Sequence, residues 1–400
     1  MEYQSNKLID YRRDSRIFRG AMDVPFLLIT LLLLCIGVIM VLSASFARAY
    51  YDPKLNNATY YFSRQLFFAV TGVGIMYLAS TFPIAVYRKF AWPFMLVSMG
   101  FLLLVPIAGV EANGARRWFS LGSITFQPSE LAKIAVILFD ANLICRYKNK
   151  MGTFTSGVLP FVVVAGIIVG LLVLEPHFSA SIIIVVISAV MMFVGGTRLI
   201  YFLLGGGAVG LLGFLVLTAT DYTSARINTW RDPFADMSGD GYQIVQSLYS
   251  IGSGGLSGLG LGQSRQKYLY LPEEHNDFIF AVVCEELGFI GAVLILLLFA
   301  LLIIRGFWLA MHCRDRYSFL VCAGITSLLA VQVILNVSVV TNLIPCTGIS
   351  LPFFSYGGTA LWLQLAEMGI ILSISRDIPE KKSVKEKQAS PPAGTSKTGV

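Results

Sequence analysis

Charged residues are scarce in this sequence. Asp, Glu, Lys and Arg together make up 13% of the 400 residues, whereas 56% are hydrophobic. An average soluble domain has about 25% charged residues, so this chain has too few to cover a soluble surface. A secreted disulfide scaffold, a disordered chain and a nucleic-acid-binding domain are therefore poor fits. The class that remains is a membrane protein that crosses the bilayer several times.

Cysteine and histidine are also rare, with six and three residues. The cysteines fall mostly in apolar runs and form no Cys-x-x-Cys pair, which favours small core residues over disulfides or metal ligands. His177 and His275 lie on the predicted external side and His312 on the cytoplasmic side, so the three cannot share one metal ion. The sequence predicts no metal site built from protein ligands.

Long apolar runs dominate the rest of the chain. A membrane-spanning helix needs about 20 mostly apolar residues. Ten runs qualify: residues 25–47, 65–83, 90–109, 129–146, 155–174, 178–195, 199–219, 277–305, 316–343 and 354–375. With both ends on one side, Lys and Arg are about twice as frequent there as outside, which makes that side the cytoplasm. The sequence predicts an all-α, polytopic integral membrane protein with N-in/C-in topology.

The same pattern divides the chain into three parts. Residues 1–24 are expected to form a cytoplasmic tail, and residues 25–375 the transmembrane domain. Residues 376–400 are rich in Lys, Ser and Pro, which is typical of a disordered cytoplasmic tail. The longest segment between spans is a large external loop, 220–276, between the seventh and eighth helices. A loop of this length is usually functional or disordered.

The polar segments gather on the predicted external side. Glu130 and Lys133 share a face at the start of the fourth helix. They form either an ion pair that positions the helix or a polar patch lining a substrate cavity. Arg116 and Arg117, directly before Trp118, can bind a phosphate from outside or anchor the chain at lipid headgroups.

Asp277 follows the external loop and is flanked by Phe278 and other apolar residues. A carboxylate at such a boundary should be partly desolvated, which raises its basicity and suits a general base. A helix cap is the alternative role. Further along, at least one of Glu285 and Glu286 should face the bundle interior.

Three sequence blocks make the chain recognisable: "GARRWFSLGSITFQPSELAK" at 114–133, the stretch 232–288 containing "GLGLGQSRQKYLYLPEEHNDF", and "PCTGISLPFFSYGG" at 345–358. With these blocks in this order, the chain resembles the SEDS family of shape, elongation, division and sporulation proteins (FtsW/RodA/SpoVE). The block at 258–273 is more similar to the FtsW/SpoVE branch than to RodA.

The resemblance implies a peptidoglycan glycosyltransferase that polymerises lipid II at the outer face of the bacterial cytoplasmic membrane, in division or sporulation. The expected partners are a class B penicillin-binding protein, other divisome or septum proteins and membrane lipid, with no nucleic acid. The family's essential acidic residue falls on Asp277, and its conserved Glu, Lys and Arg fall on Glu130, Lys133 and Arg117. We also expect Arg116, Glu273 and His275 to bind substrate.

The sequence departs from the family at two positions. His177 stands where the family commonly has Asp, and no role is assigned to it. Asn276 stands where Thr often precedes the catalytic Asp, and Asn keeps the capacity for hydrogen bonding.

No nucleotide sugar is available outside the membrane, so the donor must arrive already activated on a lipid pyrophosphate. Asp277 is expected to deprotonate the acceptor, with inversion at the anomeric carbon, and Lys133 and Arg117 to stabilise the leaving group. Glu130 would position Lys133, and a divalent cation (Mg²⁺ or Mn²⁺) would share the pyrophosphate charge. Two alternatives stay open: a lipid II flippase, and a non-catalytic scaffold for cell-wall synthases.

Overall fold

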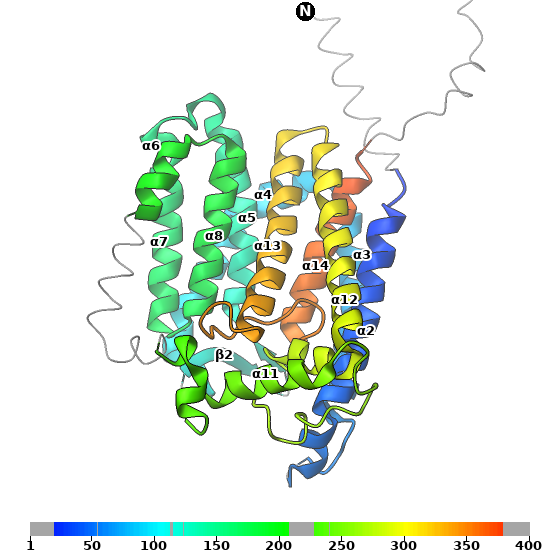
Figure 1. Ribbon diagram of the computed structural model, residues 1–400. Coiled ribbons are helices and arrows are strands. Elements are labelled where there is room, and N and C mark those ends of the chain that lie inside the picture. The colour runs from blue at the N-terminus through cyan, green and yellow to red at the C-terminus, as the bar shows by residue number, and fades with distance from the viewer. Residues whose placement is uncertain are drawn as a thin grey trace, which may run out of the picture.

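The computed structural model describes residues 20–53, 55–112, 115–122, 124–207, 228–239 and 241–378. Within these residues the chain forms a bundle of long helices (Figure 1). The long helices are α2 (Val24–Tyr51), α3 (Tyr60–Thr81), α4 (Ile84–Ala108), α5 (Pro128–Tyr147), α7 (Leu159–Leu174), α8 (Phe178–Gly195), α12 (Ile279–Met311), α13 (Arg316–Val340) and α14 (Gly358–Ser375). Shorter helices are η1 (Lys148–Lys150), α6 (Phe154–Gly157), η2 (Pro233–Asp236) and α11 (Tyr242–Gly254).

The helices confirm a multi-pass, mostly α-helical architecture. In the described part of the chain, eight helical segments are long and apolar enough to cross a membrane. α5 is a further long helix at a predicted span, but it carries more charge. The predicted span 199–219 is described only to residue 207, and the rest lies outside the described residues. The count of ten and the orientation therefore stay predictions.

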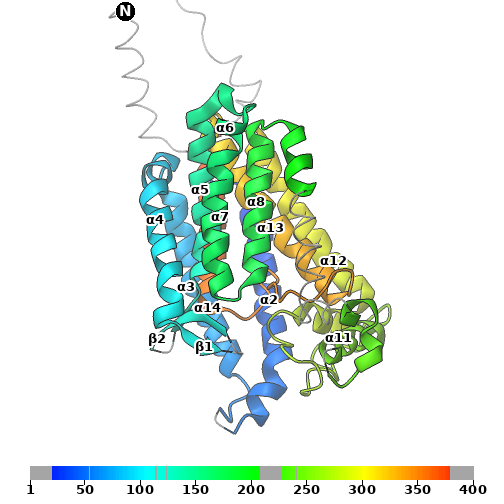
Figure 2. The same ribbon diagram turned by 90° about the vertical axis from the view of Figure 1, so that its left-hand side faces the viewer.

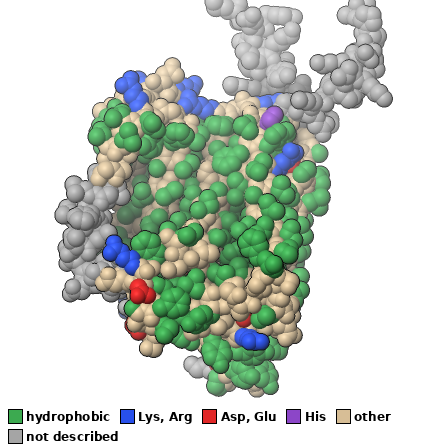
Figure 3. All heavy atoms as spheres, viewed as in Figure 1, with side chains coloured by type: hydrophobic (Ala, Val, Ile, Leu, Met, Phe, Trp, Pro, Cys, Tyr) green, Lys and Arg blue, Asp and Glu red, His purple; other side chains and the backbone are tan. Residues whose placement is uncertain are grey.

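Both ends of the described chain lie at the same end of the bundle. Gly20 N donates a hydrogen bond to Arg376 O over 3.0 Å. Arg305 of α12 pairs with Asp23, the N-cap of α2, with Nη2 2.5 Å from Oδ2. This placement is what N-in/C-in topology requires. In Figure 3, Lys and Arg side chains gather near this end, whereas the face between the two ends is mostly hydrophobic.

The helices differ in how much apolar surface they leave exposed. In the most apolar stretch of each helix, 72% of the residues are buried in α13 and in α14, against 28% in α3 and in α4. Large side chains on the outer helices are exposed, such as Leu96 and Ile107. Such a surface suits hydrocarbon, so we assign α3 and α4 to the lipid-facing ring and α13 and α14 to the interior.

α5 belongs to the interior despite its charges. It packs against α4, α8, α13 and α14. Its side chains Glu130, Lys133 and Asp140 are buried, at 9%, 2% and 1% exposure. Charged groups at membrane depth are costly unless they face protein or water. The burial explains how a helix with this composition can lie within an apolar bundle.

A small antiparallel sheet follows α4, where the all-α prediction expected only an external loop. Its strands, in the order β1-β2-β3, are β1 (Val110–Ala112), β2 (Ala115–Leu121) and β3 (Ile124–Phe126). Phe119 pairs with Phe126 across β2 and β3. Both rings contact Phe101 of α4, with centroids 6.2 and 5.7 Å away. This aromatic contact fixes the sheet on the end of α4. The sheet and α11 lie at the same end of the bundle (Figure 2).

The external loop is ordered by a break in α12. Gly288 has φ 67° and ψ −172°, a conformation open to glycine but not to L side chains. The break frees the carbonyl oxygens of Glu285 and Glu286, which accept hydrogen bonds of 3.0 Å each from Leu259 N and Gly260 N. The loop backbone therefore replaces a turn of helix. The first residues of the predicted loop 220–276 lie outside the described residues.

Candidate active site

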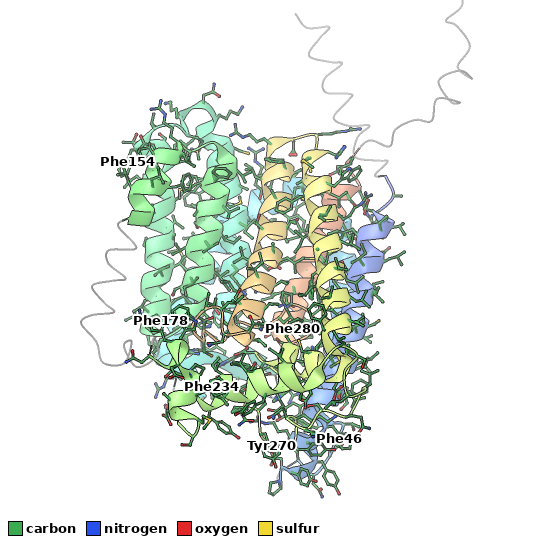
Figure 4. All side chains as sticks on the ribbon, in the orientation of Figure 1. Phe46, Phe154, Phe178, Phe234, Tyr270 and Phe280 are labelled. Atoms are coloured by element: carbon green, nitrogen blue, oxygen red, sulfur yellow. The ribbon has the colours of Figure 1, made fainter. Side chains whose placement is uncertain are left out.

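A cavity of about 460 Å³ opens at the end of the bundle opposite to Gly20 and Ile378. Its walls come from α3, β2, α5, the start of α8, α13, α14 and the segments before α12 and α14. Figure 4 shows Phe178 and Phe280, close in sequence to two cavity segments, toward this end of the bundle, and Phe154 at the other. The acidic, basic and histidine side chains that line the cavity are Arg64, Arg117, Glu130, Lys133, His177, Glu273 and Asp277.

The backbone around Asp277 is held by hydrogen bonds to three successive carbonyl oxygens. Asn336 of α13 donates from Nδ2 to Asp277 O over 2.8 Å and to Ile349 O over 2.7 Å. Ser355 Oγ donates to the carbonyl of residue 276, and the Tyr356 backbone to that of residue 275, each over 2.9 Å. Segment 345–358 and α13 therefore fix the position of Asp277.

The Asp277 carboxyl group has the properties expected of a general base. Burial, and next the negative charge of Glu273, raise the pKa of Asp277 to about 6, although Arg117 lowers it. The cap residue of α12 is Phe278, and no side chain caps the helix there. Gly348 has φ +68°, and a Cβ atom there would lie 3.2 Å from Asp277 Oδ2. A glycine at this position leaves the carboxylate room.

Glu130 and Lys133 form the ion pair that the sequence predicts. Lys133 Nζ lies 2.7 Å from Glu130 Oε2, and both side chains are buried and line the cavity. The pair is therefore an intrahelical ion pair and also part of the cavity wall. Gln332 of α13 and Gln364 of α14 line the same cavity.

Arg117 and Arg116 point to different sides of β2, because side chains alternate along a strand. Arg117 lines the cavity and donates from Nη2 to Pro176 O over 2.5 Å. Arg116 has 53% of its side chain exposed and lies 3.9 Å from Glu111, and it is not part of the cavity wall described here. The structure thus brings only one of the two arginines to Asp277.

His177 also lines the cavity, where its Nε2 lies 3.4 Å from Gln127 Nε2. Burial, with further contributions from Arg117 and Lys133, lowers the pKa of His177 to about 3. The imidazole is therefore neutral at physiological pH. A neutral ring offers hydrogen bonding without charge, where a carboxylate would add a negative one.

Glu273 and His275 lie on opposite sides of the chain. Glu273 lines the cavity and accepts a 2.5 Å hydrogen bond from Asn276 Nδ2. His275 packs its ring against Tyr61, with centroids 4.7 Å apart, and its Nδ1 lies 3.6 Å from Glu274. The structure therefore places Glu273, but not His275, in the wall of the cavity.

Glu285 and Glu286 are both buried, which confirms the prediction that at least one faces the interior. Glu285 accepts from Ser264 Oγ over 2.5 Å and from Arg265 N over 2.9 Å. Glu286 pairs with Lys267 over 3.0 Å. These carboxylates anchor the external loop to α12 rather than act in the cavity.

Arg64 is a further cation of the cavity wall that the sequence does not predict. It lies in the first turns of α3, and Nη1 donates to Tyr60 OH over 2.6 Å. The span predicted at 65–83 begins directly after Arg64, so the sequence indicates an external positive charge there and no role in a site. The sequence feature that could indicate this residue is a single arginine at the outer border of an apolar run.

Comparison with known proteins places this arrangement in a family. The sequence model of the FtsW/RodA/SpoVE cell cycle proteins matches residues 24–379. The chain belongs to the FtsW/RodA/SpoVE family. It is 43% identical to stage V sporulation protein E of Bacillus subtilis, over 88% of this chain and 97% of the relative. It is 38% identical to a probable peptidoglycan glycosyltransferase FtsW of Geobacter sulfurreducens, over 88% of this chain and 95% of the relative.

Solved structures agree with this membership. The rod shape determining protein RodA of Thermus thermophilus superposes with a TM-score of 0.66 at 29% identity, covering 90% of this chain and 98% of RodA. A chain of a peptidoglycan synthase complex, studied for its coordination of polymerization and crosslinking, gives a TM-score of 0.75 at 28% identity, covering 89% and 98% of the two chains. The FtsW/RodA/SpoVE fold is therefore confirmed for this multi-pass membrane protein.

Proposed function

We propose that this protein polymerises lipid II into glycan strands at the outer face of the bacterial cytoplasmic membrane, in division or sporulation. The observation that carries the proposal is the cavity that joins a carboxyl group of raised pKa, Asp277, to the cations Arg117 and Lys133. The FtsW relatives are named as probable peptidoglycan glycosyltransferases, and this supports the same activity here.

In the proposed reaction, Asp277 takes the proton of the acceptor sugar's 4-hydroxyl group. The oxygen forms a bond to the donor's anomeric carbon, and the bond from that carbon to the lipid pyrophosphate breaks. The electron pair leaves on the pyrophosphate, and the proton stays on Asp277 until water removes it. A direct attack inverts the anomeric centre, so an α-linked pyrophosphate gives a β-linked glycan.

The departing pyrophosphate needs positive charge where its own charge develops. Arg117 lines the same cavity as Asp277, so it is available to the departing group. Lys133 supplies a second cation, and Glu130 orients its ammonium group at 2.7 Å. Arg116 and His275 lie outside the cavity wall, so we give them no direct part in this step.

A Mg²⁺ or Mn²⁺ ion at the pyrophosphate stays part of the proposal. Among the described residues, no group of three or more His, Cys, Asp or Glu side chains is placed to hold a metal ion. Two carboxylates, Glu273 and Asp277, line the cavity. They suit a hard cation whose remaining ligands are pyrophosphate oxygens and water.

The proposed partner is a class B penicillin-binding protein that crosslinks the new strands, with other septum proteins around it. The likeness to a chain of a peptidoglycan synthase complex supports this proposal. The excess of Lys and Arg on the side of both termini supports a cavity that faces outward.

The test is polymerisation of lipid II by the purified protein with its cognate partner, whose own transpeptidase site is inactivated. The products of the wild type and of Asp277→Asn are sized on a gel. We expect long glycan from the wild type alone. Glycan of normal length and amount from Asp277→Asn would show that Asp277 is not the general base. Transport of lipid II in sealed vesicles without polymer favours a flippase, and intact complexes with neither activity favour a scaffold.

A further inference from the structure

A second cavity, of about 300 Å³, has no part in the proposed reaction. It lies between the end of α2 and the loop that precedes α12. The helix contributes Arg48 and Tyr51 to its wall, and the loop contributes Leu271, Pro272 and Glu274. A volume of this size is within the range of small-molecule sites.

One stretch of chain separates the second cavity from the active-site cavity. Glu273 lines the active-site cavity, and Glu274 lines the second one. Glu273 has φ 56°, which is a strained value for a side chain other than glycine. Its carbonyl oxygen accepts hydrogen bonds from Asn276 N over 3.1 Å and from Phe278 N over 3.3 Å, which hold this turn. Because Glu274 and Asp277 are three residues apart, their Cα atoms lie within about 11 Å of each other.

Arg48 presents hydrogen-bond donors to the second cavity. Its Nη1 donates to Glu274 Oε2 over 3.3 Å, and the Glu274 side chain is only 1% exposed. The Arg48 side chain is 37% exposed, and a guanidinium group has five N–H donors in a planar fork. Glu274 is therefore placed to hold the guanidinium group, and Arg48 is placed to contact a ligand.

The charges of the wall favour a neutral ligand. The carboxylate of Glu274 compensates the charge of Arg48, and Asp52 adds a second carboxylate to the wall. A phosphate or carboxylate ligand would meet two negative groups, and an ammonium ligand would meet the guanidinium group. Neutral oxygen acceptors, such as hydroxyl and N-acetyl groups, meet neither repulsion.

Tyr51 adds an open aromatic ring to the same wall. The residue is 57% exposed, and its ring packs edge-on against that of Tyr50, with centroids 5.2 Å apart. Leu271 and Pro272 make the opposite part of the wall apolar. A few polar groups among apolar and aromatic side chains are typical of a ligand site. A sugar ring, with apolar C–H faces and a rim of hydroxyl groups, matches this mixture.

We propose that the second cavity is a saccharide site that binds the glycan product next to the reacting sugars. This inference rests on the proposed function, because it takes the product to be a glycan strand. Arg48 donates to hydroxyl or N-acetyl oxygens of the strand, Tyr51 stacks on a sugar ring, and Glu274 positions Arg48. A protein that holds its product between additions makes longer strands before release.

The first experiment measures binding of a soluble saccharide to the full chain with its partner, by calorimetry in detergent. The probe is a tetramer of N-acetylglucosamine, which is neutral and carries no lipid, peptide or phosphate. Arg48→Lys keeps the charge but not the planar fork, and should weaken binding by about tenfold. Tyr51→Leu should weaken it several-fold, whereas Tyr51→Phe keeps the ring and should bind as the wild type does. Tyr50→Leu is the matched control, because Tyr50 is 55% exposed and does not line the cavity.

The second experiment measures the length of the glycan made from lipid II, with the partner's transpeptidase site inactivated. The wild type, Tyr51→Leu and Tyr51→Phe are compared at equal consumption of lipid II, so that length is read independently of turnover. We expect strands several-fold shorter from Tyr51→Leu and strands of wild-type length from Tyr51→Phe. A merely structural role of Tyr51 would lower turnover and leave the length unchanged.

Equal saccharide binding by the wild type, Arg48→Lys and Tyr51→Leu overturns the inference. Loss of the partner from these variants, with saccharide binding intact, also overturns it, because the cavity would then be a protein contact. Either result leaves the polymerase proposal standing, since that proposal is read from glycan formed from lipid II. Absence of glycan from the wild type overturns the proposed function and, with it, the assignment of the ligand as product.

Discussion

Replacing Asp277 by Asn should stabilise the protein while it abolishes polymerisation. The pKa of Asp277 in the fold is about 6, against an ordinary value of 3.8. The difference is about 2 pKa units, or about 3 kcal/mol of cost to the folded state when the group is ionised. This figure is an upper limit, because Asp277 lines an open cavity and solvent screens the charge of a group that it can reach. Asn keeps the shape of the side chain and carries no charge.

The sign follows from the raised pKa. The folded state binds the proton more tightly than the unfolded state, so the stability that Asp277 contributes is fully present below pH 3.8. It is lost as the pH rises through about 6. The gain in stability of Asp277→Asn over the wild type should therefore be absent near pH 4, grow between pH 4 and 6, and level off above pH 6.

The assay is thermal unfolding of both proteins in detergent from pH 4.5 to 8. We expect Asp277→Asn to melt a few degrees higher at pH 8 and to approach the wild type at the acid end. Asp236→Asn is the matched control, because Asp236 is an exposed residue of η2. A lower melting temperature for Asp277→Asn at pH 8, or a difference independent of pH, would refute the reasoning. That result would favour a structural role in which the ionised Asp277 carboxylate stabilises the fold.

Three more outcomes are expected. Glu273→Gln should move the acid limb of the pH profile of kcat/KM from near pH 6 to a lower pH, above about 4. The reason is that the substitution removes the negative charge that makes the second contribution to the raised pKa of Asp277. An unchanged acid limb would show that Glu273 does not affect the pKa of the general base. Lys133→Gln should lower kcat by about 100–1,000-fold in the gel assay, and near-normal turnover would exclude Lys133 as a leaving-group cation. Gly288→Ala should lower stability by at least about 1–3 kcal/mol, because its Cβ would lie 2.2 Å from Gly258 N. Gly74→Ala, which meets no atom within 4 Å, should not.

The helical architecture could be predicted because apolar runs of the right length have few other structures open to them. The shared face of Glu130 and Lys133 was equally predictable, since helical spacing alone brings these residues together, and the 2.7 Å contact confirms it. Asp277, at the start of the eighth predicted span, could be singled out as a candidate general base because its neighbours in the sequence are apolar. Whether it acts as a base stays a prediction.

The rest of the site depends on contacts between residues distant in sequence. Arg64 reaches the cavity because α3 packs beside α14, and no local pattern reveals that packing. The two arginines of β2 lie on opposite sides because a strand alternates its side chains, and the sequence predicts no strand there. His275 is expected to bind substrate, as Glu273 is, but the turn between them directs the imidazole toward Tyr61.

The buried charges of α5 also bear on how the protein is made. Inserting each charged side chain alone into a bilayer costs about 2.5–3.5 kcal/mol, and α5 carries Glu130, Lys133 and Asp140 on surfaces that its neighbours cover. Two of those neighbours, α13 and α14, are synthesised some 170 or more residues later. α5 is therefore synthesised well before the helices that bury its charged side chains. Biogenesis must shield α5 until the last helices arrive, and a chain truncated after Val340 would keep it unshielded on the side of α14.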